Sequence, residues 1–274
     1  MRQEKVVKTN ARANRFALFL TCACILSIAI ASPLTAQEEA SAAQMAQANN
    51  PLANASALNL QNYYASSLYG VPDRSTNTTW IRGVVPISRT VTRASLPLAT
   101  RPSGSTESVS GLGDFNIFTA YLFVSNPTTS IGAGPLLVAP TATDDALGQG
   151  KWQAGAAAVA FKVTPLVQFG GLLTWQGSIA GDEDRPNTSI LAAQPFVMWQ
   201  LGGGTYLRST GLWTFDLKSG DYVVPIGFGL GQVIKSGKIV YNIFLEPQFS
   251  ILHEGTGQPK VQVFAGINLQ FPKG

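Results

Sequence analysis

From residue 57 to residue 271 the chain alternates apolar and polar positions with a period of two. The clearest case is its last stretch, where apolar side chains occupy every second position at Val261, Val263, Ala265, Ile267, Leu269 and Phe271. The positions between them are mostly polar or small: Gln262, Phe264, Gly266, Asn268 and Gln270. Successive side chains of a β-strand point to opposite faces, so this pattern predicts a strand with one apolar and one mostly polar face.

Twelve segments of this kind can be marked, each rich in Val, Ile, Phe, Tyr, Trp or Thr and followed by turn-forming residues. They cover residues 57–69, 76–86, 88–98, 112–124, 130–140, 151–162, 166–178, 189–200, 205–216, 221–234, 238–252 and 259–271. The first alternates poorly. We expect an all-β protein.

The connections between these segments alternate in length, with one exception. The longer set comprises residues 70–75, 99–111, 141–150, 179–188, 217–220 and 253–258, and the shorter set residues 87, 125–129, 163–165, 201–204 and 235–237. A transmembrane β-barrel has extended loops on one side and tight turns on the other, whereas a soluble sandwich has no reason for this alternation. Closure also leaves no unpaired strand edge in hydrocarbon. We therefore predict a transmembrane antiparallel β-barrel of twelve strands in residues 57–274.

The first 36 residues have the organisation of a secretory signal peptide. Five basic residues precede an apolar run over residues 16–31, and the small residue Ala36 ends the region before Gln37. Sixteen apolar residues are fewer than the roughly 20 that a spanning helix needs. We expect cleavage after Ala36, followed by a short helical or flexible periplasmic segment over residues 37–56.

Cleavage changes what the composition implies. The whole chain has 19 basic and 15 acidic residues, and the leader holds five and one of these, so the mature chain has 14 of each. The basic balance belongs to the leader and gives no reason to expect nucleic-acid binding. Cys22 and Cys24 leave with the leader, and His253 is the single histidine. Thiol chemistry and most histidine-based catalysis or metal binding are thereby excluded, and we expect no cofactor and no metal.

One stretch and several shorter motifs resemble a known family. The stretch is GAGPLLVAPTATDDALGQGKWQAG at residues 132–155, and the shorter motifs are GDEDRP at 181–186, QPF at 194–196, YLRSTG at 206–211 and EPQ at 246–248. They are similar to bacterial outer-membrane barrel proteins labelled transporter-like, or related to meta-pathway phenol-degradation proteins, and misleadingly neuromedin-U-like. The resemblance implies an outer-membrane barrel and, by these labels, transport, but neither a substrate nor catalytic residues. Outer-membrane chains often end on an aromatic residue, whereas here Phe271 is followed by Pro-Lys-Gly.

The polar face of the strands supplies the candidate lumen residues. The set is Arg82, Arg93, Arg208, Glu246, Gln248, Gln176, Asn242 and Asn268. In a water-filled pore their charges would set ion selectivity. In a plugged barrel Arg82, Arg93, Arg208 and Glu246 would instead pair in a structural network. The sequence leaves both open, although the inward positions of Phe244, Phe264 and Leu212 favour a narrow or partly filled lumen.

Two further clusters could carry chemistry. The acidic loop residues are Asp144, Asp145, Asp182, Glu183 and Asp184, which could hold divalent cations of lipopolysaccharide or simply be solvated. An outer-membrane hydrolase would have to act through His253, with Ser250 or Thr256 near it in sequence and no serine motif around them. We therefore do not expect an enzyme.

The expected function is passive or facilitated passage of small solutes across the outer membrane. The alternative is a non-conducting barrel with a structural role or one that handles hydrophobic ligands, because Gly227, Gly229 and Gly231 could leave room for an apolar molecule at the wall. The expected partners are outer-membrane lipid, lipopolysaccharide and the barrel-assembly machinery.

Overall fold

The computed structural model describes residues 48–104 and 106–272. The predicted signal peptide and most of the segment 37–56 lie outside these residues. The described chain is almost entirely β-structure, and its single helical element is the one-turn 3-10 helix η1 (Asp145–Leu147). No helix in this part of the chain is both long and apolar enough to span a membrane.

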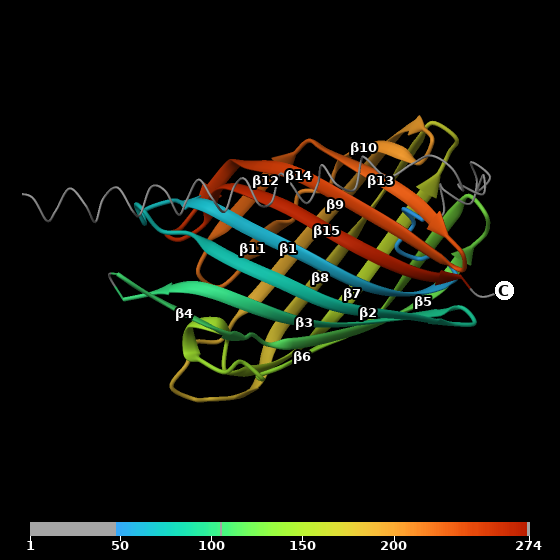
Figure 1. The fold of residues 1–274 in the computed structure, drawn as a ribbon. Helices are drawn as coiled ribbons and strands as arrows, with labels where there is room; N and C mark the ends of the chain where they lie inside the picture. The colour runs from blue at the N-terminus through green and yellow to red at the C-terminus, as the bar shows by residue number, and fades with distance from the viewer. Residues whose placement is uncertain (1–47, 105, 273–274) are drawn as a thin grey trace, which may run out of the picture. The chain divides into compact units, whose positions relative to one another are not determined.

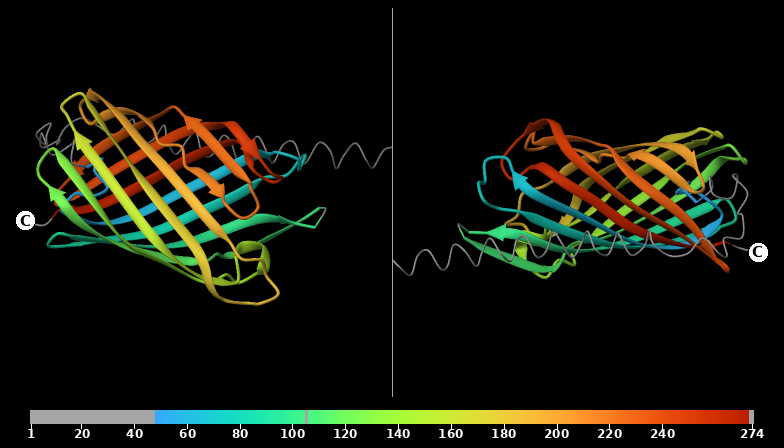
Figure 2. Two further views of the ribbon diagram at one scale, coloured as in Figure 1. Left: turned by 180° about the vertical axis from the view of Figure 1, so that it is seen from behind. Right: turned by 45° about the horizontal axis from the view of Figure 1, so that its top comes forward.

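The strands form a closed antiparallel barrel (Figures 1 and 2). In chain order they are β1 (Ala55–Leu68), β2 (Thr76–Ile87), β3 (Thr90–Ser103), β4 (Glu107–Leu112), β5 (Phe115–Ser125), β6 (Thr129–Ala139), β7 (Lys151–Val163), β8 (Val167–Gly181), β9 (Ser189–Gly202), β10 (Thr205–Ser209), β11 (Trp213–Asp216), β12 (Tyr222–Gly227), β13 (Gly229–Ser236), β14 (Ile239–Glu254) and β15 (Pro259–Pro272). Each barrel strand pairs with the strands before and after it, and β1 pairs with β15 from Ala55↔Pro272 onward, which closes the ring.

Three of the barrel strands are interrupted, so the fifteen segments make twelve strands. Both β4 and β5 pair with β3, both β10 and β11 pair with β9, and both β12 and β13 pair with β14. The predicted strand number and fold class are confirmed. The interruption at residues 210–212 contributes to the interior site described below.

The predicted connection over residues 99–111 is wrong in part. Pairing continues from Thr100↔Ser110 to Ser103↔Glu107, so most of this stretch is a β-hairpin that extends the barrel wall. Gly104 has a φ of 59°, a left-handed conformation that glycine adopts without strain and that lets the chain turn back. The turn between β2 and β3 also differs slightly, because it consists of Ser88 and Arg89.

The outer surface of the barrel is apolar. Large hydrophobic side chains are exposed along it, among them Leu58, Leu60, Ile81, Val85, Phe123, Leu173, Val197, Phe249, Ile251 and Val261. Trp152, Trp175 and Trp199 are also exposed. An apolar outer band is the surface that a membrane-spanning barrel presents to lipid.

The interior is chemically divided along the barrel axis. Toward the short turns the inward side chains form an apolar cluster that includes Val84, Val91, Phe118, Leu122, Val159, Phe161, Met198 and Val233. Leu52, from the segment before β1, is buried in the same cluster. We call the end of the barrel that carries the short turns the short-turn end. In Figure 1 the blue start of the described chain lies within this end. Farther from the short turns the buried interior residues are mainly polar.

Candidate functional site

An ion pair lies inside the barrel where β10 approaches β14. The Arg208 Nε donates to Glu246 Oε2 at 2.8 Å, and the two side chains are 6% and 0% exposed. The guanidinium also lies 3.6 Å from the centre of the Phe244 ring. The carboxylate is therefore removed from water and held by a cation that stacks on an aromatic ring.

The break between β10 and β11 supplies the remaining donors to this carboxylate. Thr210 lies in the break, and its backbone N donates to Glu246 Oε1 at 2.8 Å while its hydroxyl donates to Oε2 at 2.7 Å. Gln248 Nε2 donates to Oε1 at 2.9 Å, and Gln262 Nε2 donates to Gln248 Oε1 at 2.7 Å. Each carboxylate oxygen of Glu246 thus has two donors, so this charge is fully committed within the protein.

Three glycines of the tenth barrel strand make room for this network. A Cβ on Gly227 would lie 2.3 Å from Glu246 Oε1, and one on Gly231 would lie 2.2 Å from the Tyr206 ring. Gly229 is equally close to the backbone of β14. The space beside these glycines is filled by the protein itself, which contradicts our interpretation that they accommodate an apolar ligand.

The segment before β1 enters the short-turn end and is tied to the barrel wall. Asn242 Nδ2 donates to Asn49 Oδ1 at 2.8 Å and to the Ala48 carbonyl at 3.2 Å, and Gln270 Nε2 donates to the same carbonyl at 2.9 Å. Tyr206 fixes the Asn242 side chain by donating to its Oδ1 at 2.6 Å. Leu52, 7% exposed, packs into the apolar cluster. We call residues 48–54 the inner segment; no feature of the sequence pattern predicted this position.

Arg82 and Arg93 occupy the opposite wall, and neither pairs with a carboxylate of the described residues. Arg82 pairs with Ser95 in the β2–β3 register and Arg93 with Val84, so the two arginines are diagonal neighbours on the inward face. Arg82 donates to the Gln61 carboxamide oxygen, and Gln61 in turn donates to Asn268 at 2.9 Å. Within the described chain Arg93 has no hydrogen-bond or ion-pair partner, and its guanidinium lies 4.5 Å from the centre of the Phe118 ring.

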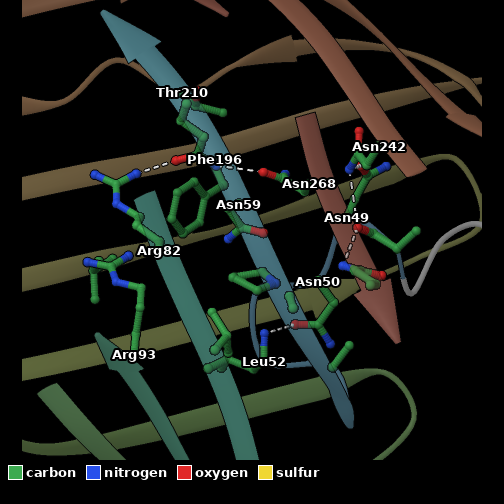
Figure 3. Close-up of a pocket in the computed structure, with 18 of the residues that line it drawn as sticks. Asn49, Asn50, Leu52, Asn59, Arg82, Arg93, Phe196, Thr210, Asn242 and Asn268 are labelled. Atoms are coloured by element: carbon green, nitrogen blue, oxygen red, sulfur yellow. Dashed lines mark hydrogen bonds between the residues drawn. The ribbon is translucent and has the colours of Figure 1, made fainter. Parts of the chain in front are cut away.

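A cavity of about 130 Å³ remains between these groups (Figure 3). It is lined by Arg82 and Arg93, by the inner segment, by Arg208 and Thr210, and by apolar side chains of β7, β8 and β9. No aspartate or glutamate of the described residues lines it. In the close-up Arg82 and Arg93 lie one above the other with their guanidinium groups extended to the same side. The cavity therefore has a cationic wall for which the described part of the chain supplies no counter-charge.

The structure divides the predicted lumen set. Arg82, Arg93, Arg208, Asn242 and Asn268 line the cavity, whereas Glu246 and Gln248 lie behind it in the buried network. Gln176 is closer to the long loops, where its Nε2 donates to Gln153 Oε1 at 3.0 Å. Of the four charges, two pair as a structural network would require and two remain open to the cavity. Contacts between strands that are distant in the sequence determine which of these charges pair, and the sequence pattern does not show those contacts.

The acidic loop residues are not gathered into one site. Asp144 caps η1 by accepting from Ala146 N, and Asp145 pairs with Arg185 at 3.0 Å. Asp182 accepts from Asp184 N at 3.0 Å within its own loop. In the described residues no group of three or more His, Cys, Asp or Glu side chains is placed to hold a metal ion.

The residues considered for a hydrolase are also engaged elsewhere. The His253 ring stacks on Tyr69 with ring centroids 3.3 Å apart. The Ser250 hydroxyl donates to the Pro259 carbonyl at 2.6 Å. This arrangement leaves the serine hydroxyl directed at backbone rather than at the histidine.

Comparison with solved structures relates the fold to outer-membrane channels. An outer membrane channel from Pseudomonas putida F1 superposes with a TM-score of 0.57 at 14% identity, covering 88% of this chain and 99% of that one. The NanC porin superposes with a TM-score of 0.50 at 11% identity, covering 78% of this chain and 98% of that one. No protein-family model matches the chain, and no curated protein matches it in sequence. At these identities the likeness establishes a shared fold.

Proposed function

We propose that this protein is an outer-membrane channel for the passage of small solutes. The observation that carries the proposal is the cavity of about 130 Å³ inside the barrel, bounded by two arginines that have no carboxylate partner in residues 48–104 and 106–272. A barrel with a purely structural interior would fill such a space or pair such charges, because buried unpaired charge costs folding free energy. The apolar outer wall and the fold shared with outer-membrane channels support the same conclusion.

The inner segment is the proposed gate of this channel. It closes the short-turn end through Leu52 and through the hydrogen bonds of Asn242 and Gln270 to Ala48 and Asn49. These contacts involve few side chains, so the segment can leave while the barrel, held by its closed ring of strand pairs, stays intact. Solute passage would require this displacement.

The proposed function includes a location in the outer membrane and membership of the transporter-like barrel family. A signal peptide over residues 1–36 would direct the chain to export, and the barrel-assembly machinery, lipid and lipopolysaccharide would be its envelope partners. The motifs at residues 132–155 and 181–186 favour the transporter-like family that the sequence resembles.

A non-conducting barrel is the second candidate. It is favoured by the buried network around Glu246, whose hydrogen-bond capacity is filled by Arg208, Thr210 and Gln248, and by the burial of Leu52. The side chains of this network and of Leu52 fill part of the lumen, as expected of a barrel that does not conduct.

Conductance in a planar lipid bilayer distinguishes the two candidates. The refolded mature protein should show small, discrete openings, and Leu52→Ala should open more often because it weakens the burial of the inner segment. Leu58→Ala is the matched control, since Leu58 is 46% exposed on the outer surface and should leave conductance unchanged. Electrical silence of both the wild type and Leu52→Ala would favour the non-conducting barrel.

A further inference from the structure

No carboxylate of residues 48–104 or 106–272 faces the cationic wall of the cavity. Both oxygens of Glu246, which lies behind the cavity, are occupied by Arg208, Thr210 and Gln248. Among the described residues no carboxylate lines the cavity, so this part of its wall carries the positive charges of Arg82 and Arg93 without a counter-charge. Arg82 and Arg93 are diagonal neighbours on one face, so their like charges repel each other, and an anion placed between them would offset this repulsion.

Two buried nitrogen atoms of these arginines also lack a hydrogen-bond acceptor. The Nε of Arg82 and the Nε of Arg93 are both inaccessible to solvent and without a hydrogen-bond partner. Guanidinium groups present several donors in a fixed plane that matches the two oxygens of a carboxylate. Two such groups extend to the same side of one cavity (Figure 3), and among the described residues the only acceptor bound to them is the Gln61 carboxamide oxygen, which accepts from Arg82.

The rest of the cavity defines the body of the ligand. Away from the arginines its walls include Val159, Leu172, Phe196 and Met198, with Leu52 contributed by the inner segment. These side chains offer no strong hydrogen bond and favour an apolar group. A cavity of about 150 Å³ holds one benzene molecule, so the space here of about 130 Å³ suits a carboxylate with a single small ring or a short alkyl chain.

We propose that Arg82 and Arg93 form a binding site for one small organic carboxylate whose apolar body lies against Phe196 and Met198. The inference rests on the proposed function in that it names the class of solute the channel would carry, but binding itself does not require passage. Asn59 and Gln61 line the same space, and Gln61 holds Arg82 in place by accepting a hydrogen bond from it.

Equilibrium binding to the refolded mature protein in detergent tests this site without a membrane. The probe is benzoate at fixed ionic strength, followed by titration calorimetry, with benzamide as the neutral analogue of the same shape. Benzoate should bind with one site per chain and benzamide at least about tenfold more weakly, because only the carboxylate accepts charge-assisted hydrogen bonds from both guanidinium groups.

Substitutions then locate the site. Arg82→Gln and Arg93→Gln should each weaken benzoate binding about tenfold or more, and Arg93→Lys should retain part of it because the charge remains. Arg74→Gln, in the loop between β1 and β2 and outside the cavity, is the matched control and should bind as the wild type does. Heat-modifiable migration on a detergent gel checks that each variant is folded.

The outcomes separate the site from the channel. Benzoate binding that is lost in both arginine variants supports the site even if the protein proves electrically silent. Absence of benzoate binding to the wild type, equal binding of benzamide, or unchanged binding in folded Arg82→Gln and Arg93→Gln would overturn it, whether or not the barrel conducts.

Discussion

Arg208 and Glu246 meet inside the barrel at 2.8 Å although 38 positions separate them in the chain. The pair forms because the gap between β10 and β11 turns Thr210 toward the carboxylate, and because Gly227 leaves space for it. The same carboxylate is thereby unavailable to Arg82 and Arg93. Arg208 is therefore held in an ion pair on one side of the interior, whereas Arg82 and Arg93 line the cavity on the other side without a carboxylate partner among the described residues.

Glu246→Gln should destabilise the barrel strongly. The substitution leaves Arg208 charged and buried without its partner, and removing one member of a buried pair typically costs about 3–5 kcal/mol. The midpoint of unfolding in urea, followed by the shift between folded and unfolded bands on a detergent gel, measures the loss. The double variant Arg208→Met with Glu246→Leu should lose much less, because no charge is left unpaired. Equal loss in both proteins would contradict the assignment of the effect to the orphaned charge.

Neighbouring positions of β1 should respond in opposite directions to a new carboxylate. Asn59 lines the cavity in register with Arg82, so Asn59→Glu should stabilise the barrel and weaken benzoate binding by occupying the arginines. Leu60 is 48% exposed on the outer surface, so Leu60→Glu places charge against lipid and should cost about 1–2 kcal/mol. Unfolding in lipid vesicles measures both. Similar losses at the two positions would mean that the faces of β1 are assigned incorrectly.

The inner segment can be locked in place by a disulfide, because the predicted mature chain contains no cysteine. The side chains of Asn49 and Asn242 meet through a 2.8 Å hydrogen bond. The thiols of Asn49→Cys with Asn242→Cys therefore lie on facing positions, and a thiol assay measures how completely they oxidise to the disulfide. Oxidation should lower the frequency of channel openings, and reduction should restore it. The single variant Asn49→Cys is the control and should not respond to the oxidant. Openings that persist after complete oxidation would show that the segment does not gate passage.

Much of the barrel could be predicted because its determinants are local. A period-two pattern over residues such as 261–271 fixes the face of every side chain, and turn chemistry separates one strand from the next. The predicted strand boundaries are less accurate where contacts between strands, rather than the local pattern, determine the structure. The hairpin from Thr100 to Ser110 is set by strand pairing, which the local pattern of residues 99–111 does not show.

The site could be predicted only in part, for a related reason. Alternation places Arg82, Arg93, Arg208 and Glu246 on the inward face, but their partners are determined across the barrel. The inner segment is the clearest case, since Asn49 meets Asn242 at a separation of 193 residues. Nothing local in the polar, alanine-rich sequence before residue 51 indicates that contact.

The reversal potential of single channels under a salt gradient tests the central claim most directly. Arg82 and Arg93 give the cavity an uncompensated positive charge, so the wild type should pass anions in preference to cations. The double variant Arg82→Gln with Arg93→Gln should lose that preference, and Arg74→Gln should keep it. A silent protein, a cation-preferring wild type, or an anion preference unchanged in the double variant would contradict the account.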